Sequence, residues 1–176
     1  YRLSKNWTTS LAYGIFYQNP ETQYFGSSPL NFQKSEHYIL QVQKSESGRS
    51  FRAEIFYKNY DDLIKTKVLD YRQTAFNNTA DGFAKGIELF WRDKKSIKNI
   101  DYWVSYSYLD SKRNFQNYDQ SLFPSFAAKH TLSLVAKKFV SNWKTGFNAS
   151  YNYASGRPFY NFRTNDEGDY FLNNQG

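Results

Sequence analysis

The stretch "IDYWVSYSYLD", residues 100–110, decides the fold of this chain. Its large apolar and aromatic side chains recur at every second position from Ile100 to Tyr108, and Ser105 and Ser107 stand between them. A period of two is the repeat of a β-strand, in which successive side chains point to opposite faces of the sheet. The segment therefore predicts a strand with one apolar face and one polar face.

Six other segments alternate in the same way, at residues 7–17, 36–44, 51–61, 85–92, 130–139 and 143–154. Several are longer than the ~5–6 residues usual for a strand and match the ~9–11 residues that a tilted strand needs to cross a bilayer. We expect seven long strands and no helix of any length. Residues 61–69 allow either a helical turn or a short extra strand.

The composition fits apolar side chains confined to alternate positions. The chain has 176 residues and a mean hydropathy of -0.79, although 20% of its residues are aromatic. No run approaches the ~18 apolar residues of a membrane-spanning helix. The net charge of +7 is spread along the chain without a basic stripe, so we expect no nucleic-acid partner. There is no Cys and no Met, even at position 1, and we expect a processed chain or a piece of a larger one.

Long and short connections alternate between the expected strands. The long ones cover residues 18–35, 62–84 and 111–129 and the C-terminal stretch, and the short ones cover 45–50, 93–99 and 140–142. In an up-and-down meander this pattern places all long connections at one end. Short periplasmic turns and long extracellular loops are typical of outer-membrane barrels, so we expect the first strand to run outward.

This direction sorts the apolar side chains into zones. Aromatic rings with a polar group favour the two membrane interfaces. We expect a periplasmic girdle of Trp7, Trp91 and Trp143 and an outer girdle of Tyr17, Tyr38, Tyr57, Tyr108 and Tyr153. Between them we expect four lipid-facing residues near mid-membrane, namely Leu11, Ile55, Val104 and Phe147. Trp103 does not fit, because its parity directs it to the interior.

The other parity is mostly polar and predicts the inner wall of a barrel. We expect its charged residues, Arg52, Glu54, Lys58, Glu88 and Arg92, to form cross-strand ion pairs. Five apolar residues break the rule on this side, and a plug packed against the wall would explain them. They are Phe16, Ile39, Phe56, Phe90 and Val135.

An ordered series of segments resembles the barrel of TonB-dependent outer-membrane receptors. The series consists of "SLAYGIFYQNPETQYF", "KSEHYILQVQKS", "FRAEIFYKNYDDLI", "DGFAKGIELFWR", "VSYSYLDSK", "FPSFAAKHTLSLVAKKF" and "YNYASGRPFY". The triplet Gly86-Ile87-Glu88 is its most recognisable piece. The resemblance implies a barrel of about twenty-two strands filled by an N-terminal plug. Such receptors import metal chelates, cobalamin or glycans with energy delivered through TonB.

Seven strands cannot close so large a barrel. The resemblance therefore implies that residues 1–176 are a partial transmembrane β-barrel domain that lacks the plug and the closing strands. The expected location is the outer membrane of a Gram-negative bacterium. The expected partners are outer-membrane lipid, the rest of the barrel and its plug, TonB through the missing N-terminal part, and an imported small ligand.

The long connections carry aromatic residues among Asn, Gln and Ser, which suits stacking on a sugar or an aromatic chelate. The candidates for ligand contact are Tyr24, Phe25, Phe76, Phe115, Tyr118 and Phe123; alternatively these rings pack loop against loop. A nucleophile elbow, a phosphate loop and a His-Glu zinc spacing are missing from the sequence. We expect no enzyme activity, no catalytic or metal-binding residue and no cofactor.

Two other classes of protein remain open. The first is a small self-contained outer-membrane barrel that acts as an adhesin or on lipid, which needs an eighth strand from residues 160–163 or 170–172. The second is a soluble all-β module that binds glycans through exposed Tyr and Trp side chains.

Overall fold

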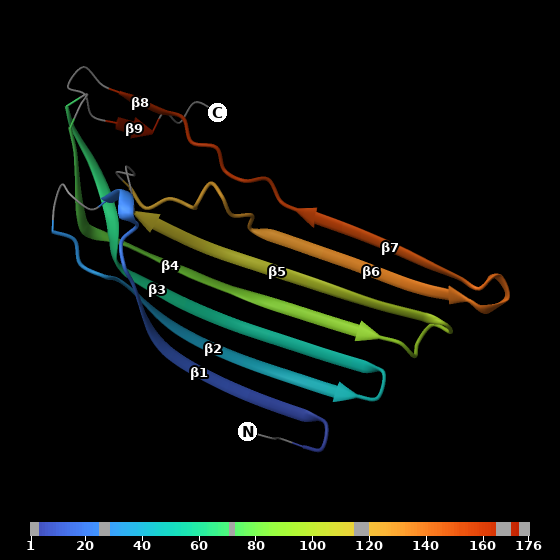
Figure 1. Cartoon of the computed structure of the whole chain (residues 1–176). Helices are drawn as coiled ribbons and strands as arrows, with labels where there is room; N and C mark the ends of the chain where they lie inside the picture. Colours follow the sequence, from blue (N-terminus) through green and yellow to red (C-terminus); the bar gives the residue numbers. More distant parts are fainter. Residues whose placement is uncertain (1–3, 25–28, 71–72, 115–119, 165–169, 173–176) are drawn as a thin grey trace.

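One seven-stranded antiparallel sheet forms the body of the computed structural model, which describes residues 4–24, 29–70, 73–114, 120–164 and 170–172. Each strand pairs with its sequence neighbour, in the order β1 to β7, which confirms the predicted meander (Figure 1). The strands are β1 (Trp7–Gln18), β2 (Gln33–Glu46), β3 (Arg49–Asp70), β4 (Gln73–Asp93), β5 (Ile100–Asn114), β6 (His130–Val140) and β7 (Thr145–Ala154). In the described part of the chain, no helix has the length and apolar character to span a membrane.

The register places residues of like polarity opposite one another across the strands. One row joins Leu11, Leu40, Ile55 and Ile87 from β1 to β4. The neighbouring row, one residue away on each strand, joins Ser10, Gln41, Glu54 and Glu88. Successive side chains of a strand point to opposite faces, so one face of the sheet carries the apolar rows and the other carries the polar rows.

The β3–β4 hairpin corrects the prediction of a long loop at residues 62–84. Both strands continue through this region and pair as far as Asp70 and Gln73, beyond the reach of β2. A bulge interrupts the pairing where Asp62 adopts a positive φ of 56°, and the register shifts between Tyr60 and Leu63. Bulges bend a strand and increase its twist, and the hairpin bends away from the sheet in Figure 1.

The short turns lie together at the opposite end of the sheet from the long connections (Figure 1). Gly48, with a φ of 74°, lies in the tight β2–β3 turn. The β6–β7 turn is a single 3-10 turn, η2 (Ser141–Trp143), followed by Lys144 in the left-handed region. Trp143 therefore lies in a turn, whereas the sequence pattern predicted that it begins a strand.

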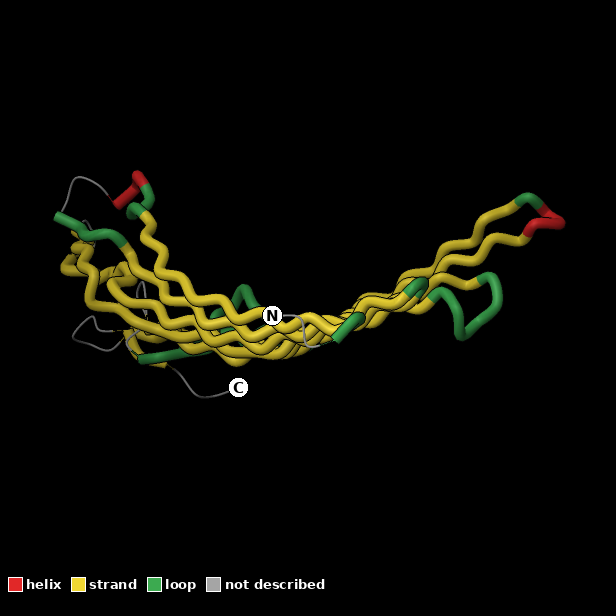
Figure 2. The backbone as a smooth tube through the Cα atoms, turned by 90° about the horizontal axis from the view of Figure 1, so that it is seen from below, coloured by secondary structure: helices red, strands yellow, loops and turns green. Residues whose placement is uncertain are grey.

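The remaining elements are small. A 3-10 turn, η1 (Thr22–Tyr24), lies in the β1–β2 connection. The strands β8 (Phe162–Thr164) and β9 (Tyr170–Leu172) pair with each other in a separate sheet, so neither adds an eighth strand to the large sheet. Figure 2 shows the large sheet twisted and curved along its length. Twist of this kind is the ordinary outcome for strands of L-amino acids.

Little of this fold is buried. Apart from two prolines, the described apolar side chains with less than a tenth of their surface exposed are Phe56, Leu63, Ile64, Ala80, Ala84 and Phe123. All but Phe123 belong to β3 and β4. Among the described residues, the apolar face of the sheet therefore has no core of its own.

Candidate functional site

The apolar face is exposed over its whole width. Leu11, in the edge strand, is 82% exposed, and Ile55 and Ile87 in central strands remain more than a third exposed. Three of the four residues predicted to face lipid, Leu11, Ile55 and Phe147, are exposed on this face, and Val104 is half-buried on the same face. A contiguous apolar surface of this size marks a contact with a membrane or another protein.

Aromatic side chains gather toward both ends of this face. Tyr13, Tyr38 and Tyr57 form one cross-strand row, with ring centroids 5.0 and 6.3 Å apart. Near the short turns, Trp7 and Trp91 share another row, and Trp143 packs edge-on against Phe147 with centroids 6.2 Å apart. Of the other predicted girdle residues, Tyr17 and Tyr153 are exposed near the ends of β1 and β7, on the side of the long connections. Tyr108 is also exposed, but it lies within β5, several residues before that strand ends. Their role at a membrane interface stays a prediction.

Two hollows lie on the polar face of the sheet. A hollow of about 480 Å³ spans β3 to β7, and its polar lining residues are Arg52, Glu88, Ser105, Ser107, Thr131, Ser133 and Asn152. A second hollow of about 530 Å³ lies toward the long connections, between β1, β2, β3 and β5. Hydroxyl, amide and charged groups on a curved wall of this kind suit water or a polar ligand.

Aromatic rings on the polar face are covered by basic side chains. The Arg52 guanidinium lies 6.0 Å from the centroid of Phe90, and the Lys58 ammonium lies 5.3 Å from that of Phe56. Phe16 packs on His37 with centroids 4.6 Å apart. Cation–π contacts of this kind let a ring remain on a wet surface. Cation–π contacts thus account for Phe56 and Phe90, and the ring contact with His37 accounts for Phe16, without a plug.

Trp103 follows the same rule at the short-turn end. Its ring has the Arg92 guanidinium at 5.5 Å and the Lys137 ammonium at 5.1 Å. Arg92 also donates two hydrogen bonds to Asp101, of 2.9 and 2.6 Å. The tryptophan whose parity pointed to the interior is thus held between two cations.

The inner-wall carboxylates behave in two ways. Asp101 is paired with Arg92 across the β4–β5 turn, as a cross-strand ion pair should be. Glu54 and Glu88 stand directly opposite each other on β3 and β4. Among the described residues, no basic side chain lies within ion-pair distance of either glutamate. The prediction of cross-strand ion pairs among Arg52, Glu54, Lys58, Glu88 and Arg92 is therefore wrong for the two glutamates. Arg92 does form an ion pair, but with Asp101, which the prediction did not include.

Arg113 is the residue of the second hollow that the sequence analysis missed. Its guanidinium lies 4.3 Å from the ring centroid of Tyr60, two strands away. The residue between them in register is Gly82, and a Cβ there would come within 2.8 Å of Arg113 Cγ. Because glycine has no side chain, the arginine crosses β4 and stacks over the tyrosine. The signal was a glycine on the polar parity of an otherwise regular strand.

The predicted ligand-contact residues divide into three groups. Phe123 is only 8% exposed, and its carbonyl accepts a hydrogen bond of 2.9 Å from the Tyr160 hydroxyl. Tyr24 and Phe76 pack on each other in a T-shaped contact at 5.0 Å. Phe25, Phe115 and Tyr118 lie outside the described residues. The rings that are described pack within the loop region, and ligand contact by any of the six stays a prediction.

The acidic and histidine side chains of the described residues do not cluster as metal ligands. No three of them lie close enough together to hold an ion. The two histidines make ordinary hydrogen bonds: Ser35 Oγ lies 2.6 Å from His37 Nε2, and Tyr106 Oη lies 2.8 Å from His130 Nδ1.

Comparison with known proteins identifies the fold. No protein-family model matches the chain, and no curated protein matches it. Among solved structures, it is similar to the FrpB iron transporter from Neisseria meningitidis (F3-3 variant), with a TM-score of 0.70 and 11% sequence identity. The similarity covers 97% of this chain and 28% of the transporter chain.

These findings define the class of fold. The chain is an all-β antiparallel meander, and its fold is similar to part of an outer-membrane transporter. The particular structure that it resembles is that of an iron transporter, and this chain spans little more than a quarter of the length of that transporter chain.

Proposed function

We propose that this chain is part of an outer-membrane receptor and transporter that captures a scarce, bulky ligand for uptake energised through TonB. The observation that carries the proposal is the two-faced wall, with apolar side chains exposed on one face and hollows among polar side chains on the other. The ordered resemblance to TonB-dependent receptors and the similarity in fold to an iron transporter support the same function.

The proposed orientation follows from the connections. The short turns would face the periplasm and the long connections the outside, as is usual for bacterial barrels. The hollow around Arg113 would then open toward the arriving ligand, and the hollow around Glu88 would lie deeper in the lumen. A ligand that enters from outside would meet the rings and the guanidinium first.

The chemistry of the outer hollow favours one ligand class among metal chelates, cobalamin and glycans. The aromatic rings of Phe16 and Tyr60 offer stacking surfaces, and Arg113 offers a charge with directional donors. A guanidinium binds carboxylate and similar oxygens more strongly than neutral hydroxyls. We therefore favour an anionic chelate with aromatic rings, carried as cargo.

An uptake experiment tests the proposal. The full-length protein is expressed in a Gram-negative host lacking its own iron receptors, with and without TonB. The probe is ⁵⁵Fe bound to 2,3-dihydroxybenzoate, compared with ⁵⁵Fe bound to citrate. We expect the protein in the outer-membrane fraction and uptake of the aromatic chelate only where TonB is present. Uptake of neither chelate, or equal uptake without TonB, would contradict the proposal.

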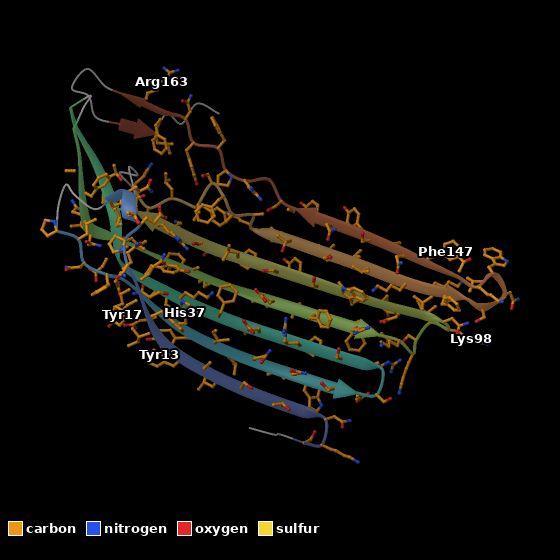
Figure 3. All side chains as sticks on the ribbon, viewed as in Figure 1. Tyr13, Tyr17, His37, Lys98, Phe147 and Arg163 are labelled. Atoms are coloured by element: carbon orange, nitrogen blue, oxygen red, sulfur yellow. The ribbon has the colours of Figure 1, made fainter. Side chains whose placement is uncertain are left out.

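Arg113→Gln sharpens the test. Removing a charged donor from a ligand site costs about 1.5–3 kcal/mol, so we expect the half-saturating chelate concentration to rise roughly tenfold or more. Arg163→Gln is the matched control, because Arg163 lies on β8 and does not line the hollow (Figure 3). Protein abundance in the outer membrane must be equal in all three strains.

The two alternatives are less well supported. A small closed barrel needs an eighth strand beside β7 or β1, and β8 and β9 pair only with each other among the described residues. A soluble module has no evident reason to expose apolar side chains from β1 to β7 on one face. Fractionation of the full-length protein into the soluble phase would favour the soluble glycan-binding module.

A further inference from the structure

A groove lies at the short-turn end of the sheet, between the β4–β5 turn and the β6–β7 hairpin. Two adjoining hollows of about 380 and 580 Å³ make it up, and both are lined by Asn99, Lys138, Phe139 and Phe147. Trp143 closes the larger hollow on the side of the β6–β7 turn. Figure 3 shows Phe147 and Lys98 at this same end of the sheet.

The apolar part of the groove lies on the exposed apolar face. Lys138 pairs in register with Ile100 on one side and Phe147 on the other, so its aliphatic stem runs between two apolar side chains. Phe147 and Trp143 remain 48% and 70% exposed even though their rings touch. A lysine in this setting buries its stem in an apolar layer and presents its ammonium to the layer's polar edge.

The turn that carries Trp143 is held in place by hydrogen bonds. Lys144 N donates to Ser141 O at 3.1 Å, and Thr145 Oγ1 donates to Trp143 O at 2.8 Å. The backbone that presents the indole is thus tied on both sides. A site built on an ordered turn loses little entropy when it binds.

The charges at this end leave an excess of cations. Each of the described carboxylates here already contacts a basic group, in the pairs Lys44–Glu46 (2.8 Å), Arg49–Asp93 (3.0 Å) and Arg92–Asp101 (2.6 Å). Lys98, Lys138 and Lys144 have no carboxylate within ion-pair distance among the described residues. An anion brought to this groove therefore meets uncompensated positive charge.

We propose that the groove binds one anionic phospholipid of the leaflet next to the short turns. Its phosphate contacts the Lys138 ammonium, with Lys98 and Lys144 nearby as further cations, and an acyl chain lies along Phe147 and Trp143. Charge complementarity selects this occupant, because a neutral apolar partner would leave the lysines without a counter-ion and a soluble anion would leave the rings exposed. The inference rests on the proposed membrane location and goes beyond the proposed transport.

Native mass spectrometry of the full-length protein, extracted from outer membranes and stripped of lipid in detergent, tests the site. The probes are phosphatidylglycerol and phosphatidylcholine, each added at equal concentration. A basic residue near a membrane surface contributes about 1 kcal/mol toward an anionic lipid, which corresponds to roughly fivefold in affinity. We expect Lys138→Gln to reduce the bound phosphatidylglycerol about fivefold, and Trp143→Ala to reduce it as well.

Lys112→Gln is the matched control. Lys112 is an exposed lysine of β5 toward the long connections, and it lines neither hollow of the groove. We expect this variant to retain phosphatidylglycerol like the wild type, and we expect phosphatidylcholine to bind more weakly throughout. Glycerol phosphate, which has the anion without the chains, should not compete.

Three results would overturn the lipid site. They are unchanged phosphatidylglycerol binding by Lys138→Gln, equal loss in Lys138→Gln and Lys112→Gln, and equal binding of the two lipids by the wild type. Heat-modifiable migration in gels checks that each variant is folded; if Trp143→Ala fails this check, the two lysine variants still decide. Absence of TonB-dependent uptake with the lipid preference intact would reject the proposed transport and leave the lipid site standing.

Discussion

Two neighbouring rows of side chains in this sheet differ by a single residue along each strand. The first row joins Leu11, Leu40, Ile55 and Ile87, and the second joins Ser10, Gln41, Glu54 and Glu88. The backbone ladder is the same in both rows, because the same strands pair through both. The two rows therefore differ only in the medium that their side chains are suited to meet.

The two faces of the sheet are stabilised in different ways. Within the described chain, the apolar row is exposed and forms no core, so its burial depends on something outside the chain. The polar face is held together by cation–π contacts, a bidentate ion pair and glycines that admit neighbouring side chains. One face is thus completed by lipid in our account, and the other is largely satisfied within itself.

Arginine on each face provides the largest contrast. Ile55→Arg places a charge in the middle of the apolar face, and we expect it to lower the free energy of unfolding from a bilayer by about 2–4 kcal/mol. Ser105→Arg, on the polar face, should lower it much less, because its side chain meets a hollow with other polar groups. Chemical unfolding of the full-length protein in lipid vesicles measures both. Equal losses of unfolding free energy in the two variants would show that the two faces do not meet different media.

A glycine on the polar face gives the next effect in size. A Cβ at Gly86 would collide with the backbone oxygen of Tyr108 and would lie 2.7 Å from the Phe56 ring. We expect Gly86→Ala to destabilise the barrel by about 1–3 kcal/mol, since the backbone must move to admit the methyl group. At Gly156 a Cβ meets nothing within 4 Å, so Gly156→Ala should leave the unfolding midpoint unchanged. A harmless Gly86→Ala would show that the strands are spaced more widely there.

Loss of an ion pair should have a smaller effect. Asp101→Asn leaves Arg92 with a weaker acceptor and removes the counter-ion of Lys94, which lies 3.7 Å away. The pair is partly exposed to solvent, and such pairs contribute little in water. We expect a lower unfolding midpoint than in the wild type, with a smaller decrease than Gly86→Ala produces. An unchanged midpoint would mean that the pair only orients the Trp103 ring.

The two facing glutamates should give the smallest change, and one of opposite sign. Like charges directly opposite on neighbouring strands repel, by an amount within about 1 kcal/mol. Glu88→Gln is therefore expected to leave stability unchanged or raise it slightly, and added salt should remove the gain by screening. A clear loss of stability in Glu88→Gln would reveal a cation bound between Glu54 and Glu88 in the complete protein.

Much of the fold was predictable from the period of two. Apolar side chains recur at every second position from Ile100 to Tyr108, with Trp103 as the exception, and this pattern predicted the strands, their order and the face on which Leu11 and Ile55 lie. The β3–β4 extension was not predictable in this way. Leu63 and Ile64 are neighbours on β3 and both are buried, so burial in the hairpin does not alternate along the strand, and residues 62–84 resemble a polar loop in the sequence.

The candidate site was harder to predict for another physical reason. The stacking of Arg113 over Tyr60 depends on a register that brings them to the two sides of Gly82. Sequence shows that a glycine interrupts the strand, but the neighbour that fills its place comes from a distant segment. The pairing of Trp143 with Phe147 was hidden as well, because it depends on the geometry of the β6–β7 turn.

The central claim is that alternate residues of each strand meet lipid and water. The chain contains no Cys, so single cysteines can be introduced at residues 102–109 of β5 and carry a spin label without background. Collision with oxygen reports lipid, and collision with a water-soluble nickel chelate reports the lumen. We predict oxygen access at positions 102, 104, 106 and 108 and nickel access at positions 103, 105, 107 and 109. Equal access at both sets, in the full-length protein in vesicles, would contradict the account.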